Sequence, residues 1–90
     1  MSLKSKKYRV EVTPRFRKML KKLDYKAQLR TLGKLKELEV QPHSFKRLRG
    51  PLTGRYAMRI GNYRVIYTID EDKTRVVVHT VVHRRIAYER

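Results

Sequence analysis

The feature that most constrains the fold is a pair of alternating segments separated by Gly61-Asn62. Large apolar side chains occupy every second position on both sides of this break: Tyr56, Met58, Ile60, Tyr63, Val65, Tyr67 and Ile69. Such alternation predicts two strands that each bury one face. A two-residue loop that begins with glycine is typical of a tight hairpin. The segment therefore predicts an antiparallel hairpin in which Ile60 pairs with Tyr63.

The same register places two arginines next to each other. Arg59 and Arg64 pair across the predicted hairpin, on the face opposite the large apolar residues. Like charges in this arrangement cost about 0.2–1 kcal/mol, and the interaction becomes favourable when an anion lies between them. We interpret the pair as a candidate phosphate-binding site. The alternative is that both guanidinium groups extend into water or reach nearby carboxylates.

Upstream of the hairpin, the sequence predicts one strand followed by a helix. Residues 8–12 alternate between apolar and charged side chains, which is typical of a half-buried strand. Thr13 is a favoured N-cap, and Pro14 is tolerated at the first helical position. Apolar residues then follow at helical spacing at positions 16, 19, 20 and 23. We therefore expect a helix that begins directly after Thr13.

A second helix is predicted from Asp24, which can cap it, to Gln41-Pro42, which ends it. Leucines at every third position are expected to form its buried side: Leu29, Leu32, Leu35 and Leu38. Gly33 in this helix costs about 1 kcal/mol relative to alanine. It either permits close approach to a neighbouring element or marks a weak point. Residues 43–54 predict an irregular connection in which 46–49 is extended.

After the hairpin, residues 75–82 are rich in β-branched side chains and predict a last strand. The order β-α-α-β-β-β predicts an α+β fold, with a small antiparallel sheet packed against an N-terminal helical hairpin. Ninety residues suffice for one such domain, which we place at residues 1–90. There is no run of roughly 20 apolar residues, no apolar signal segment and no cysteine. We therefore expect a soluble, cytoplasmic domain.

The charge of the chain is strongly positive and uneven. Lys and Arg number 24 against 8 Asp and Glu, a formal net charge of +16. Residues 1–50 hold 16 of the basic side chains and 4 of the acidic ones. A compact domain with this charge repels itself, so a polyanionic partner such as RNA explains the composition best. A solvated lysine-rich surface is the alternative, but such surfaces usually balance Lys with Glu.

The histidines do not predict a metal site. Under strict alternation His79 and His83 share one face of the last predicted strand, and His43 is expected in an exposed loop. No cysteine or carboxylate completes a recognised ligand spacing with them. We expect neither a metal ion nor another cofactor.

Three segments taken together resemble the RelE/ParE superfamily of toxins from toxin–antitoxin systems. They are Lys46-Arg47-Leu48-Arg49-Gly50, the predicted hairpin from Arg55 to Tyr67, and Val82-His83-Arg84-Arg85-Ile86-Ala87-Tyr88. Within the superfamily the chain is most similar to the RelE-like messenger-RNA interferases, including archaeal members. The resemblance implies a microbial RNase fold. It also implies ribosome-dependent cutting of mRNA in the A site, in which the substrate's own 2′-OH attacks the scissile phosphate without a metal ion.

The resemblance also implies which residues act. The implied catalytic residues are Arg59, Arg64, Arg84, Arg85 and Tyr88. The arginines would stabilise the extra negative charge on the phosphate, with Arg84 and Arg85 as alternatives at one position. Tyr88 would transfer a proton or stack on a base, and His83 is a reserve acid or base. The family's strand usually has two basic residues separated by one, and Ala57 replaces the first of them here, so the general base stays unassigned.

The expected partners are polyanions. Residues expected to bind RNA are Lys18, Lys21, Lys22, Lys26, Lys46, Arg47 and Arg49. The resemblance implies a 70S-type ribosome with its mRNA, and an acidic RelB-like antitoxin with which the toxin would form a heterotetramer. No membrane partner is expected, because the amphipathic helices are needed for the core. Two alternatives stay open: a ParE-like toxin that inhibits gyrase, and a non-catalytic module that binds ribosomes or RNA.

Overall fold

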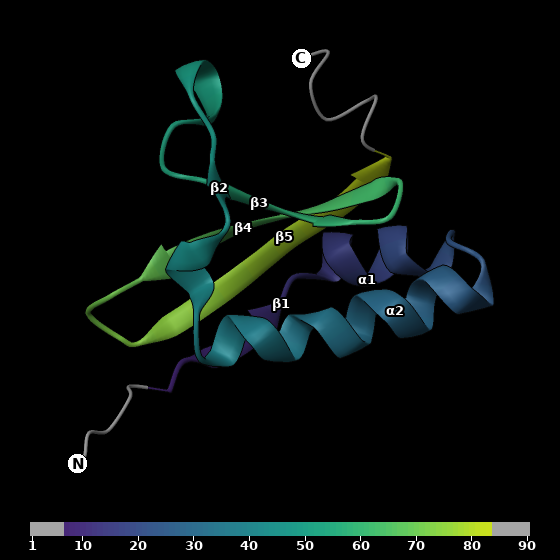
Figure 1. Ribbon diagram of the computed structural model, residues 1–90, viewed down its shortest axis with the longest axis horizontal. Coiled ribbons are helices and arrows are strands. Elements are labelled where there is room, and N and C mark those ends of the chain that lie inside the picture. The colour runs from purple at the N-terminus through teal and green to yellow at the C-terminus, as the bar shows by residue number, and fades with distance from the viewer. Residues whose placement is uncertain (1–6, 84–90) are drawn as a thin grey trace.

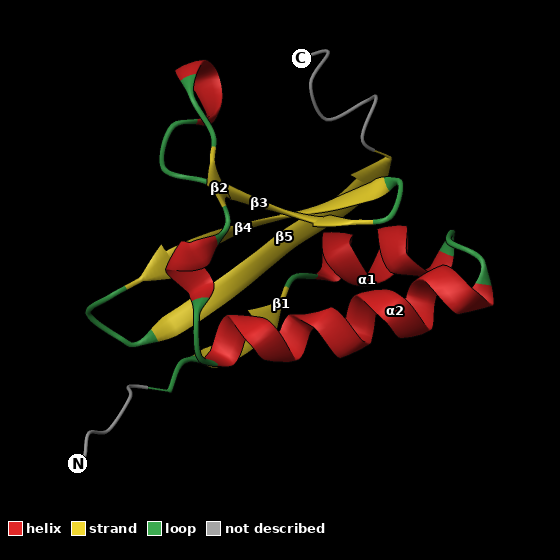
Figure 2. Cartoon of the chain, in the orientation of Figure 1, coloured by secondary structure: helices red, strands yellow, loops and turns green. Residues whose placement is uncertain are grey.

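A five-stranded sheet with two helices on one face makes up the computed structural model, which describes residues 7–83 (Figure 1). The strand order is β1-β5-β4-β3-β2. The strands are β1 (Arg9–Val12), β2 (Lys46–Arg47), β3 (Tyr56–Ile60), β4 (Tyr63–Asp70) and β5 (Arg75–His83). The helices are α1 (Pro14–Lys21) and α2 (Tyr25–Leu35), which lie side by side (Figure 2). The predicted α+β class and helical hairpin are confirmed.

The sheet is mixed, because β1 pairs with β5 in parallel and Val12 lies opposite Val78. The expectation of an all-antiparallel sheet is wrong for this pair. After β1 the chain passes through both helices and through β2, β3 and β4. It then enters β5 at the end of the sheet where β1 begins, with Arg75 opposite Arg9, so the two strands run in one direction. The extended segment predicted after residue 45 is confirmed as the two-residue edge strand β2, which pairs with β3.

The predicted starts of both helices are confirmed by their caps. The Thr13 side chain accepts a hydrogen bond from the Phe16 amide at 3.1 Å. The Asp24 side chain accepts one from the Ala27 amide at 2.7 Å. The second helix ends earlier than predicted, at Leu35, and a 3₁₀ turn at Lys36–Glu39 follows it.

The buried side of α2 differs from the predicted leucine stripe. Leu35 and Leu38 are buried, but Leu29 and Leu32 are 51% and 47% exposed. Each three-residue step rotates the side-chain direction by about 60°, because an α-helix has 3.6 residues per turn. The four leucines therefore spread around the helix, and Thr31, which is fully buried, lies on the core side in their place.

The main core lies between the helices and one face of the sheet, which we call the helix face. Its buried members include Phe16, Leu38, Met58, Val65 and Tyr67. The predicted hairpin pairings are confirmed at every position from Tyr56 opposite Tyr67 to Ile60 opposite Tyr63. The Tyr67 hydroxyl donates a hydrogen bond to the Pro42 carbonyl at 2.6 Å. This bond fastens the irregular connection to the centre of the sheet.

The opposite side of the sheet, which we call the outer face, carries a second and smaller apolar cluster. Leu48, Ala57 and Ile66 are buried in it, and Leu52 packs against them. The segment after β2 therefore covers part of the outer face. Among the residues that the structure describes, no helix is both long and apolar enough to cross a membrane.

Candidate functional site

The predicted arginine pair lies on the outer face at the loop end of the hairpin. Arg59 of β3 is directly opposite Arg64 of β4. Gly61 has a φ of +60°, as the predicted two-residue loop requires, and Arg59 Nε donates to its carbonyl at 3.5 Å. Arg59 is exposed, whereas Arg64 is half-buried and its Nη1 atom is buried. The Arg64 guanidinium is thus partly shielded from solvent, whereas that of Arg59 is exposed.

The carboxylates of the outer face lie at its far end, away from this pair. Glu11 contacts Arg9 at 3.0 Å and Arg75 at 3.4 Å, and Asp70 contacts Arg75 at 3.3 Å. Within the described part of the chain, these acidic groups are thus shared among cations of β1 and β5.

Position 57 of β3 is alanine, although the family pattern expects a basic residue there, because this side chain packs in a buried apolar cluster. Ala57 is 4% exposed and lies in the cluster with Leu48 and Ile66. Its partner on β2 is Lys46, which therefore shares the outer face, whereas Arg47 pairs with Tyr56 and shares the helix face. The structure separates these two predicted RNA-binding residues, and Arg49 follows as an exposed side chain.

A β-bulge changes the direction of one histidine. Ile66 pairs with Thr80 and Tyr67 pairs with Val78, so His79 is an extra residue in β5. The His79 Nε2 atom lies 2.9 Å from the Thr68 hydroxyl on the outer face. Burial, and then the charge of Arg55, lower the pKa of His79 from its ordinary value of 6.5.

His83, in contrast, pairs with Tyr63 and contacts its ring at a centroid distance of 5.5 Å. It belongs to the helix face, so the prediction that His79 and His83 share a face is wrong. The side chain of His83, which the sequence suggested as a reserve acid or base, therefore lies on the face opposite the arginine pair. The side chain of His79 lies on the same face as the pair. A bulge does not alter the composition of a run of β-branched residues, so strict alternation could not predict this change of face.

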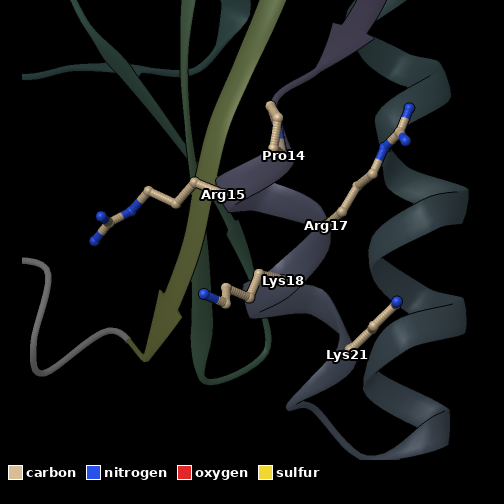
Figure 3. A pocket seen from close by; sticks show the side chains of 5 residues that line it. All are labelled: Pro14, Arg15, Arg17, Lys18 and Lys21. Carbon is tan, nitrogen blue, oxygen red and sulfur yellow. The ribbon is translucent and has the colours of Figure 1, made fainter.

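The predicted RNA-binding lysines of the helical hairpin are exposed, and two of them line a groove beside α1. Its lining residues are Pro14, Arg15, Arg17, Lys18 and Lys21, and its volume is about 600 Å³ (Figure 3). Arg15 and Lys18 extend toward one side of the helix, and Arg17 and Lys21 extend toward α2. Arg15 and Arg17 were missed as candidates, although their helical spacing with the two lysines could have indicated them. Lys22 and Lys26 are exposed nearby.

The remaining predicted catalytic residues, Arg84, Arg85 and Tyr88, lie outside the described residues. β5 ends at His83, opposite Tyr63, and hence at the same end of the sheet as the arginine pair. Residues 7–83 contain no group of three or more His, Cys, Asp or Glu side chains that could hold a metal ion. His43 is exposed as expected, and its ring contacts the Glu71 carboxylate.

Most of the chain is similar to known proteins. Residues 10–88 match the family model described as the ParE toxin of the type II toxin–antitoxin system parDE. The chain is 30% identical over 87 residues to the putative toxin RelE4 of Methanocaldococcus jannaschii, covering 92% of this chain and 93% of that protein. It is 44% identical over 45 residues to the toxin RelG of Mycobacterium tuberculosis. This second match covers 50% of this chain and spans only 52% of RelG.

Solved structures share the fold. A chain of the M. tuberculosis toxin–antitoxin complex RelBE2 superposes with a TM-score of 0.79 at 32% identity, covering 92% of this chain and 98% of that chain. A chain of the RelE–RelB complex from Pyrococcus horikoshii gives a TM-score of 0.73 at 29% identity, with 87% and 96% covered.

Proposed function

Because the chain belongs to the RelE/ParE superfamily of type II toxin–antitoxin toxins, we propose that it is a ribosome-dependent endoribonuclease that cuts mRNA in the A site. The single observation that supports this most is the direct cross-strand pairing of Arg59 with Arg64 on one face of the sheet. The proposed step is attack of the substrate's 2′-OH on the adjacent phosphate. No metal ion takes part in it.

The arginine pair suits this step because charge accumulates at the phosphate. Attack by the 2′-OH passes through a five-coordinate phosphorus with an additional negative charge, and fixed cations stabilise that state more than the ground state. Arg64 is half-buried on its strand, which restricts the freedom of its side chain before the phosphate arrives. Removal of one such preorganised donor costs about 10²–10³ in rate.

The C-terminal residues complete the proposed site. Arg84 or Arg85 would supply a third guanidinium, and Tyr88 would transfer a proton or stack on a base. Both roles come from the family resemblance. The point at which β5 ends, beside the hairpin loop, is compatible with them.

The groove beside α1 is proposed to bind ribosomal RNA. Its four cations, Arg15, Arg17, Lys18 and Lys21, lie in the helix layer and not on the outer face. They would position the toxin on the ribosome through phosphate contacts, with log K falling by about 0.7–0.9 per phosphate neutralised for each unit of log salt. These residues position the toxin and do not cut.

We also propose an acidic RelB-like antitoxin as partner. Similar chains have been solved in complexes named RelBE2 and RelE–RelB. A net charge of +16 would attract an acidic chain quickly and in a salt-dependent manner. A heterotetramer with this antitoxin and a cytoplasmic location belong to the same proposal.

The test is an in vitro assay with purified protein, programmed ribosomes and a map of mRNA 3′ ends. The expected result is a cut within the A-site codon. Arg59→Ala should lower the cut yield by about 10²–10³, while Arg9→Ala, which removes an arginine at the far end of the same face, should keep it. Intact mRNA with active ribosomes would refute the nuclease function.

A second candidate is favoured by the name of the matching family model, which is that of ParE. A ParE-like toxin would inhibit gyrase and leave mRNA intact. A gyrase supercoiling assay on the same preparation distinguishes the two functions. Ribosome binding with neither cleavage nor gyrase inhibition would indicate the non-catalytic module.

A further inference from the structure

Outside the arginine pair, the outer face carries a second polar group of side chains around the β-bulge. His79 lies beside Thr68, and Arg55 is close enough for its charge to affect the imidazole. Thr80, the next residue along β5, has a buried hydroxyl for which residues 7–83 supply no hydrogen-bond partner. None of these side chains has a role in the proposed cutting step.

The bulge is held from both sides. The Thr13 hydroxyl donates to the His79 carbonyl at 2.9 Å, and the Thr13 amide donates to the Val78 carbonyl at 3.1 Å. Thr68 contacts the imidazole from the other side at 2.9 Å. The backbone and the ring of His79 are thus both fixed before any ligand arrives. Bulges often redirect a side chain next to a functional site.

The chemistry of this group suits a nucleobase better than a phosphate. Burial lowers the pKa of His79 from its ordinary value of 6.5, which favours the uncharged ring, so the side chain contributes an aromatic surface more than a charge. Imidazole rings and guanidinium planes both stack on unpaired bases of single-stranded RNA. An aromatic surface beside a cation is a typical arrangement for binding single-stranded nucleic acid.

The position along the strand separates this group from the cut. Thr68 is four residues from Arg64 on β4, which corresponds to about 13 Å. His79 is therefore too distant to act on a phosphate held by the arginine pair. It lies on the same face, so a strand bound at the pair can extend across it.

We propose that His79, oriented by Thr68 and flanked by Arg55, is a stacking site for a base of the RNA strand next to the nucleotide that is cut. This inference rests on the proposed function for its substrate. It adds a contact with a base to the phosphate contacts proposed for Arg59 and Arg64.

The test measures the binding of a short single-stranded RNA, 2′-O-methylated at every position so that it cannot be cut, by fluorescence anisotropy at several salt concentrations. His79→Ala and His79→Gln should each weaken binding by roughly 5- to 150-fold, the range equivalent to 1–3 kcal/mol of base stacking. The slope of log K against log salt should not change, because no charge is lost. Thr68→Val, which removes the bond that orients the ring, should give a smaller loss.

Two controls sharpen this test. His43→Ala removes an exposed histidine whose ring contacts Tyr56, a residue of the helix face. This variant should bind the RNA with unchanged affinity. A series of probes with one abasic position each should contain one member for which His79→Ala has no effect, because its stacked base is already missing. Circular dichroism melting of each variant checks the fold.

The possible results distinguish failure of the stacking site from failure of the proposed function. If Arg64→Ala flattens the salt slope by about 0.7 while His79→Ala binds like His43→Ala, the stacking site is refuted and the outer face still binds RNA. If His79→Gln keeps full affinity, or if every abasic probe keeps the His79→Ala effect, the ring does not stack on a base. If Arg64→Ala changes neither affinity nor slope, the outer face is not the RNA surface and both proposals fail.

Discussion

Replacement of Arg59 by glutamine should raise the stability of the protein and lower the proposed nuclease activity. Arg59 and Arg64 are direct cross-strand neighbours, and Arg59 is exposed. Two unit charges about 7 Å apart in water repel by about 0.6 kcal/mol, within the 0.2–1 kcal/mol typical of like-charged pairs in sheets. For a domain of this size, that energy corresponds to a rise in Tm of roughly 2–5 °C.

The assay is urea unfolding followed by circular dichroism, at low salt and again at about 1 M salt, where the Debye length of about 3 Å screens the pair. The matched control is Arg17→Gln, which removes one positive charge from an exposed position on α1. At low salt Arg59→Gln should be more stable than this control by about 0.6 kcal/mol. The difference should vanish at high salt. A difference that persists at high salt, or a loss of stability, would show that the two guanidinium groups do not repel each other.

Three further predictions concern the fold. Gly33→Ala should raise the free energy of unfolding by about 1 kcal/mol, because an added Cβ meets no atom within 4 Å; thermal melting checks this, and destabilisation would contradict it. Tyr67→Phe should cost about 1–3 kcal/mol, because the Pro42 carbonyl loses its buried donor; urea unfolding in which Tyr67→Phe matches the wild type would show that water replaces the bond. The pKa of His79 in the folded state is below its ordinary value of 6.5, so unfolding takes up a proton and the stability falls as the pH drops below about 6.5. Between pH 7 and pH 5 the Tm of His79→Gln should therefore fall less than that of the wild type. Equal decreases in Tm would count against a buried neutral ring.

The hairpin was predictable because its loop length and its side-chain pattern agree. Two residues between Ile60 and Tyr63 allow one register, and alternation then assigns each face. The helix starts were predictable for a similar reason, since Thr13 and Asp24 cap through contacts within three residues. The arginine pair of the candidate site follows from the same local rules.

Features that depend on distant parts of the chain were not predictable. The bulge at His79 lies between two runs of consecutive valines, 76–78 and 81–82, in which both faces of the strand carry the same side chain, so the change of face cannot be recognised from the pattern. The three-residue spacing of Leu29 and Leu32 matched a helix but did not indicate which side the sheet would cover. The roles of Arg84, Arg85 and Tyr88 stay predictions.

The parallel pairing of β1 with β5 has a consequence for synthesis. Val12 and Val78 are neighbours in the sheet although 65 residues separate them in the chain, and among residues 7–83 β5 is the one strand beside β1. During translation, β1 emerges early but has no partner until β5 has left the exit tunnel. Contacts between such distant segments form late. A nascent chain therefore keeps β1 without its parallel neighbour until the residues of β5 have been added and released.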